Sequence, residues 1–139
     1  MVDVSLPDLS RGSVRVLLLW GPPVAWAAAI YLVSSQSLPP GVGGIPDWMT
    51  HAAAYLVLSL LLCRALAGGI RPLPARGLVL AAALGTLYGI ADEYHQSFVP
   101  ERQSEAADVA KDLLGAVVGS WLYSRVAPGW STRREAAKE

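Results

Sequence analysis

The chain has 139 residues, of which 53% are hydrophobic and only 16% are charged. This composition excludes a disordered chain and is typical of a membrane protein. Eleven basic and eleven acidic residues give a formal net charge of zero, so no overall basic field is available to bind nucleic acid. The length fits one domain, which we expect to cover residues 1–139.

Four apolar segments predict membrane-spanning helices, because a helix needs about 20 residues to cross a bilayer core. The predicted spans are residues 16–33, 51–67, 77–96 and 108–126. Pro22 and Pro23 should kink the first span, which a membrane tolerates. A signal peptide is the alternative for this segment, although its apolar run is longer than such peptides usually carry. The expected fold class is all-α integral membrane, a small bundle of four transmembrane helices.

The basic residues predict the orientation of these spans. Arginine and lysine side chains precede the first span, lie around the second connection and follow the fourth span, whereas the first and third connections have no basic excess. By the positive-inside rule, the N and C termini are cytoplasmic and the first and third connections are external. The sequence therefore predicts a multi-pass protein of the cytoplasmic membrane.

Ionisable side chains gather at the external ends of the predicted spans. Asp47, His51 and Tyr55 are spaced by four residues and share one helix face, as do Asp108 and Asp112. Ionisable groups within a span are costly and usually functional. This favours a functional role for the histidine of the first stripe.

The third span contributes Asp92, Glu93 and Gln96 at the same end. Two pairs of glycines spaced by four residues permit close helix contacts, and these are Gly85 with Gly89 and Gly115 with Gly119. The polar stripes should therefore face the packed side of the bundle. We interpret Glu101, Glu105 and His95 as flanking residues without a functional role.

Three stretches, DWMTHAAAYLVLSLLL, DEYHQSFVPER and DVAKDLLGAVVG, resemble the VanZ-like membrane proteins in order and spacing. These are small bacterial proteins named after an accessory factor in resistance to the glycopeptide teicoplanin. The resemblance covers roughly residues 34–119. It implies a cell-envelope role linked to antibiotic resistance. Asp112 stands where the family usually has asparagine, which keeps a hydrogen-bond acceptor but loses a donor.

Two functions fit these observations. In the first, a polar site at the external leaflet binds or modifies an anionic cell-envelope lipid or glycan precursor, and a divalent cation that bridges carboxylates and phosphate is compatible with it. The candidate catalytic residues are Glu93, His51 and Asp108, as general acid and base groups. The candidate binding residues are Asp47, Tyr55, Gln96, Arg102 and Asp112, with Arg102 suited to phosphate.

The alternative is a non-enzymatic membrane scaffold or partner-binding protein whose polar cluster only fixes helix packing. In that case Arg102 would neutralise Glu93 or Asp108. Transport fits poorly, because charge at one end of short helices gives no continuous polar path. A homo-oligomer would be needed to build one.

Overall fold

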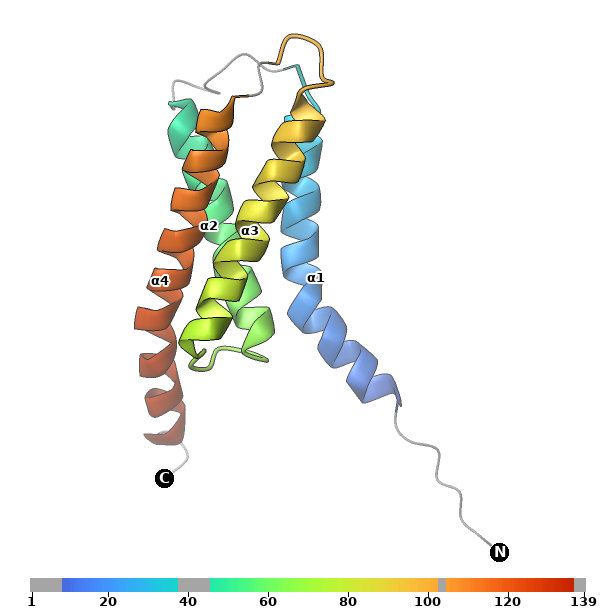
Figure 1. Ribbon diagram of the computed structural model, residues 1–139. Helices are drawn as coiled ribbons and strands as arrows, with labels where there is room; N and C mark the ends of the chain where they lie inside the picture. Colours follow the sequence, from blue (N-terminus) through green and yellow to red (C-terminus); the bar gives the residue numbers. More distant parts are fainter. Residues whose placement is uncertain (1–8, 38–45, 103–104, 137–139) are drawn as a thin grey trace, which may run out of the picture.

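The computed structural model describes residues 9–37, 46–102 and 105–136, with side chains described in 12–37, 46–102 and 105–127. This part of the chain forms four α-helices, α1 (Leu9–Ser34), α2 (Asp47–Leu66), α3 (Ala75–Gln96) and α4 (Ala106–Ala136). They run alternately in opposite directions, so that the start of α1, the α2–α3 connection and the end of α4 lie at the same end (Figure 1). The predicted all-helical class is confirmed, with one helix at each predicted span.

Proline and glycine set the limits of the central helices. Pro46 and Pro74 directly precede α2 and α3 with extended backbones, at ψ angles of 138° and 158°. Proline fits this position because the first N–H groups of a helix have no partner within the helix. After α2, the chain turns through Gly68 and Gly69, at φ angles of 67° and 135°. Glycine adopts such values without steric cost, so the turn follows directly from the sequence.

Among the described residues, three helices are long and apolar enough to cross a membrane, namely Gly12–Ser34 within α1, Asp47–Leu66 and Ala75–Gln96. Large apolar side chains on α1 are widely exposed, including Leu17 at 69% and Val24 at 65%. An apolar surface of this extent suits lipid rather than water. The chain is therefore a helical membrane protein. The described residues of α4, where the fourth span was predicted, do not meet the same criterion.

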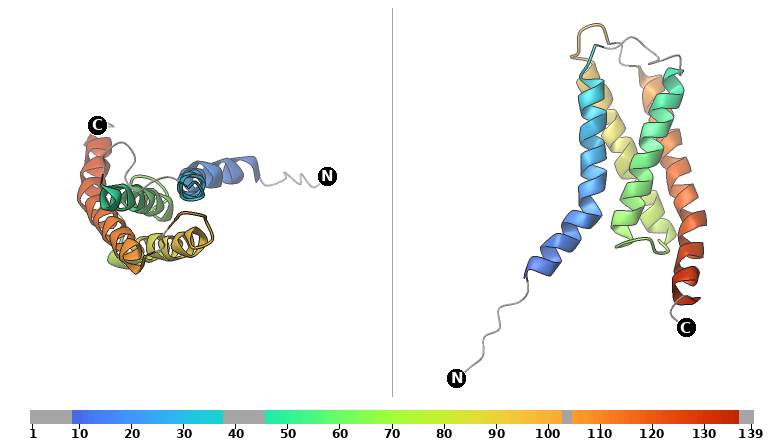
Figure 2. Two further views of the ribbon diagram at one scale, coloured as in Figure 1. Left: turned by 90° about the horizontal axis from the view of Figure 1, so that it is seen from above. Right: turned by 180° about the vertical axis from the view of Figure 1, so that it is seen from behind.

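Helix α1 contains Pro22 and Pro23 in its interior. The helix changes direction along its length, as both side views show (Figures 1 and 2). Interior proline lacks an N–H donor, and its ring crowds the preceding turn, which bends a helix. The predicted kink is confirmed.

Helices α2, α3 and α4 pack against one another, whereas α1 lies to one side and packs mainly on α2 (Figure 2). Cys63 is a free, fully buried thiol within this core. The other buried members of the core come mostly from α2 and α4, and they are Tyr55, Leu58, Leu62, Ala81, Tyr123 and Ala127.

Glycines bring α2 and α4 into backbone contact. A Cβ atom added to Gly115 would collide with the backbone of Ala52, and one added to Gly119 would collide with the backbone of Leu56. This confirms that glycines spaced by four residues lie in a tight helix contact. The contact fixes the height of α4 against α2, and with it the positions of the polar side chains that precede Gly115.

Candidate functional site

The first stripe of polar residues descends along one face of α2. Asp47 is in the first turn, with 35% of its side chain exposed, and the side chain of His51, one turn deeper, is 13% exposed. Tyr55, a further turn along, is only 1% exposed. The spacing of four residues therefore carries polar groups from the end of the bundle into its core.

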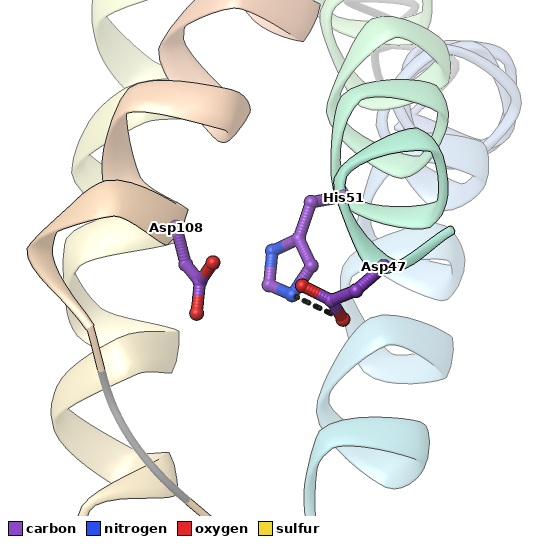
Figure 3. Close-up of side chains that lie close together, drawn as sticks. All are labelled: Asp47, His51 and Asp108. Carbon is purple, nitrogen blue, oxygen red and sulfur yellow. Dashed lines mark ion pairs between the residues drawn. The ribbon is translucent and has the colours of Figure 1, made fainter. Parts of the chain in front are cut away.

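Helix α4 presents its own polar stripe to α2. The His51 Nδ1 and Asp112 Oδ1 atoms are 2.9 Å apart and form a hydrogen bond between the two helices. Lys111 forms ion pairs with Asp47, at 3.1 Å from Nζ to Oδ2, and with Asp108. Lys111 therefore links Asp47 of α2 to Asp108 of its own helix, and it does not pair with Asp112 in the described contacts. Figure 3 shows Asp47 and His51 on α2 facing Asp108 on α4.

Helix α3 closes the cluster with buried side chains. Asp92, Glu93 and Gln96 are only 3–5% exposed, although they lie in the last turns of the helix. Ser34 of α1 donates a hydrogen bond to Asp92 Oδ1 at 2.6 Å, and Gln96 Nε2 donates to Asp92 Oδ2 at 3.0 Å. Asp92 thus links α1 to α3.

Sequence reasoning gave neither Asp92 nor Lys111 a site role, yet both belong to the cluster. Asp92 had a usable signal, because it lies within the motif DEYHQ and on the same face as Gly85 and Gly89. Lys111 had a weaker one, because its spacing of three residues from Asp108 permits an ion pair on one helix.

Arg102 and His95 contact α1. Arg102 donates from Nε to the carbonyl oxygen of Gln36 at 3.1 Å and from Nη2 to that of Val33 at 3.3 Å. His95 forms a hydrogen bond of 2.9 Å with Ser35 Oγ, and its ring packs on an α1 tyrosine. Arg102 therefore holds the end of α1, and its described hydrogen bonds go to backbone carbonyls rather than to a carboxylate.

Two buried polar atoms of the cluster have no hydrogen-bond partner among the described residues. They are the Tyr55 hydroxyl oxygen and Asp112 Oδ2, and both residues are 1% exposed. A buried polar atom without a hydrogen bond costs about 1–3 kcal/mol. Such atoms at the meeting point of three helices indicate a place where a ligand would be stabilised.

The described side chains also form two groups with the composition of a metal site. In each group the ligand atoms lie within 4.8 Å of one another, and the groups are Asp47, His51 and Asp108, and His51, Glu93 and Asp112. The structure thus brings together all three candidate catalytic residues and two candidate binding residues, Asp47 and Asp112. Tyr55 and Gln96 lie beside them in the core, and Arg102 lies toward α1.

Comparison with known proteins agrees with the sequence motifs. The family model VanZ/LLP1 matches residues 20–127, which cover most of the described helices. Searches of curated proteins and of solved structures found no match. The matched range includes the polar residues of α2, α3 and α4, together with the glycines that pack α4 against α2. The chain therefore belongs to the VanZ/LLP1 family.

Proposed function

We propose that the polar cluster binds an anionic cell-envelope lipid or glycan precursor at the external leaflet of the cytoplasmic membrane. The observation that carries this proposal is a pair of buried polar atoms, on Tyr55 and Asp112, that have no hydrogen-bond partner in the described part of the chain. They lie in a cluster enclosed by α2, α3 and α4. A ligand that meets these atoms recovers the free energy that they lose by burial. We extend the proposal to a link with glycopeptide resistance, because the VanZ-like family is named after an accessory factor in teicoplanin resistance.

The proposal includes four membrane spans with cytoplasmic termini. Helix α4 exposes Leu114, Val117 and Trp121 at 49–56%, which supports contact with lipid along this helix. Arginines at the α2–α3 connection, Arg71 and Arg76, support a cytoplasmic position for that end. The polar cluster then lies at the external leaflet, where lipid-linked envelope precursors are presented.

The chemistry of the cluster favours a ligand with hydroxyl groups as well as phosphate. Asp92, Glu93 and Asp112 are hydrogen-bond acceptors when ionised, so they accept hydrogen bonds from sugar hydroxyls. A phosphate is repelled by these carboxylates, and it is better placed near Arg102, which lies on the α1 side. A lipid-linked glycan phosphate supplies both groups.

If the protein modifies its ligand, His51 and Glu93 are the stronger acid–base candidates. Asp112 accepts a hydrogen bond from the His51 ring or donates to it, and so orients the imidazole. A carboxylate beside a histidine is the usual way to fix the ring of a general base. Asp108 is less available for this role, because it is held by Lys111.

The scaffold alternative is favoured by one observation. The contacts of His51 with Asp112 and of Lys111 with Asp47 join α2 to α4, so they fix helix packing whether or not a ligand binds. Buried ion pairs fix the alignment of packed helices more than they stabilise the fold, because the cost of desolvating the charges offsets their attraction. In this reading the cluster has no ligand, and substitutions in it change only folding and partner binding.

Native mass spectrometry distinguishes the two functions. The purified wild-type chain, incubated with a polyprenyl phosphate in detergent, is compared with Glu93→Gln, Arg102→Ala and the exposed control Glu105→Gln. We expect the lipid to be retained by wild type and control and lost from the two cluster variants, with helicity unchanged. Equal retention by all four proteins, or none by wild type, contradicts the proposal. Unfolding of both cluster variants supports the scaffold function.

Cysteine labelling tests the topology. Ser97→Cys and Pro72→Cys, each in a Cys63→Ala background, place an exposed thiol at opposite ends of the bundle. A membrane-impermeant maleimide should label the first in intact cells and the second only after lysis. The reverse pattern would place the polar cluster on the cytoplasmic side.

A further inference from the structure

We infer that His51, Glu93 and Asp112 form a binding site for a divalent transition metal, with zinc as the best-fitting ion. One ligand atom from each of these residues lies within 4.8 Å of the others. Each residue comes from a different helix, α2, α3 and α4 respectively. A metal here would therefore hold together the three helices of the core.

The separation of the ligand atoms suits a small cation. Zinc binds histidine nitrogen and carboxylate oxygen at about 2.0–2.2 Å, which places the ligands of a tetrahedral centre about 3.4 Å apart. His51 Nδ1 and Asp112 Oδ1 are already 2.9 Å apart. The other ligand atoms lie within 4.8 Å, so they must approach by about 1.4 Å at most, which rotation about side-chain χ angles supplies without moving the helices.

A second observation indicates a ligand at this place. Asp112 is 1% exposed, and its Oδ2 atom has no hydrogen-bond partner among the described residues. A Cβ atom on Gly89 would lie 2.7 Å from this oxygen, so the carboxylate occupies its position only because residue 89 is glycine. A carboxylate oxygen buried in this way is stabilised by a cation. The Tyr55 hydroxyl is also buried and has no hydrogen-bond partner in the described structure.

The other group, Asp47, His51 and Asp108, is the weaker metal site. Its two carboxylates already contact the ammonium group of Lys111. This ammonium supplies the positive charge that a metal would bring, and it would repel a divalent ion at the same place. In the described structure, Asp112 of the inner group forms no ion pair with Lys111.

Burial and ligand chemistry select zinc over magnesium. Magnesium prefers oxygen ligands and keeps several waters, whereas imidazole suits zinc and other transition metals. The His51 side chain is 13% exposed and that of Asp112 is 1% exposed, which leaves little room for a hydrated ion. Three protein ligands leave the fourth zinc position open, as in catalytic zinc sites. Resting on the proposed function, this open position would take a hydroxyl oxygen of the envelope precursor.

Zinc titration of the full-length chain in detergent tests the inference. After removal of metals with a chelator, zinc sulfate is titrated calorimetrically and bound zinc is counted by elemental analysis, with magnesium chloride as comparator. We expect one zinc per chain and much weaker magnesium binding. Glu93→Gln and Asp112→Asn should weaken zinc binding by at least about 100-fold, because even indirect partners of a metal ligand contribute about 10–100-fold.

Glu105→Gln is the matched control, because it removes an exposed carboxylate outside both groups. It should bind zinc with the affinity of wild type to within about threefold, or about 0.7 kcal/mol. Asp47→Asn removes a carboxylate of the outer group that lies 3.7 Å from His51 Nε2, so it should weaken zinc binding less than Glu93→Gln or Asp112→Asn does. Circular dichroism and gel filtration establish that each variant is folded. If Asp112→Asn does not fold, the absorption spectrum of cobalt bound to the wild-type chain, and its loss on adding zinc, tests for a tetrahedral site.

Three results would overturn the inference. The first is that the wild-type chain binds no zinc at about 100 μM. The second is that Glu93→Gln and Asp112→Asn bind zinc as tightly as wild type does. The third is that Asp47→Asn loses zinc binding while Glu93→Gln retains it. Retention of polyprenyl phosphate without zinc binding rejects the metal site and leaves the proposed function intact. Zinc binding without retention of polyprenyl phosphate supports the metal site and rejects the proposed function.

Discussion

The contact between Gly115 and α2 gives the sharpest test of how packing supports the polar cluster. A Cβ atom on Gly115 would lie 2.9 Å from the carbonyl carbon and 3.0 Å from the Cα atom of Ala52. Carbon atoms pack best at about 3.5–4.0 Å. The obstacle is backbone, which does not rotate away, so Gly115→Ala requires α2 and α4 to move apart by about 0.5–1 Å.

This movement should break the hydrogen bond between His51 and Asp112, because His51 is next to Ala52 on α2 and Asp112 is three residues before Gly115 on α4. Their distance of 2.9 Å would lengthen beyond the range of about 2.7–3.2 Å for such bonds. Overpacking costs about 1–3 kcal/mol and a buried polar group left unpaired about 1–3 kcal/mol. Alanine recovers up to about 1 kcal/mol through its higher helix propensity. We expect a net loss of about 2 kcal/mol in the free energy of unfolding.

Reversible unfolding by sodium dodecyl sulfate, followed by circular dichroism, measures this loss. The matched control is Gly12→Ala on α1, where no atom of another helix lies within 4 Å of the added Cβ. The control should be neutral or slightly stabilising. If Gly115→Ala is as stable as Gly12→Ala, the close approach of α2 and α4 does not constrain the protein.

Two further substitutions test individual contacts. Lys111→Met should destabilise the chain by about 1–3 kcal/mol in the same unfolding assay, because it leaves buried Asp108 and part-buried Asp47 without their cation. Adding Asp108→Asn should restore part of this loss. A double variant no more stable than Lys111→Met would contradict the pairing. Tyr88→Phe removes a hydrogen bond of 2.6 Å to a backbone carbonyl of α1, so amide hydrogen exchange in α1 should accelerate. The control Tyr94→Phe changes an exposed tyrosine and should have no effect on this exchange. Equal exchange rates in both variants would contradict an anchoring role for Tyr88.

The helices themselves could be predicted from local sequence. Apolar length predicted a helix at each of four segments, and the structure has one there. Pro46, Pro74, Gly68 and Gly69 act within one turn of the chain, so α2 and α3 begin and end within four residues of the predicted limits. The stripe along α2 is equally local, because residues four apart share a face on any α-helix. The peripheral position of α1 could not be predicted, because it depends on which apolar faces meet.

The partners of the polar side chains were decided by tertiary structure. The rotation and height of α4 against α2 are set by the contacts of Gly115 and Gly119, and they bring Asp112 to His51. The same placement brings Lys111 to Asp47, and the position of α1 gives Arg102 two backbone carbonyls. Sequence spacing fixes which residues share a helix face, whereas a contact between helices depends on distances of a few tenths of an ångström, which only the packed bundle determines.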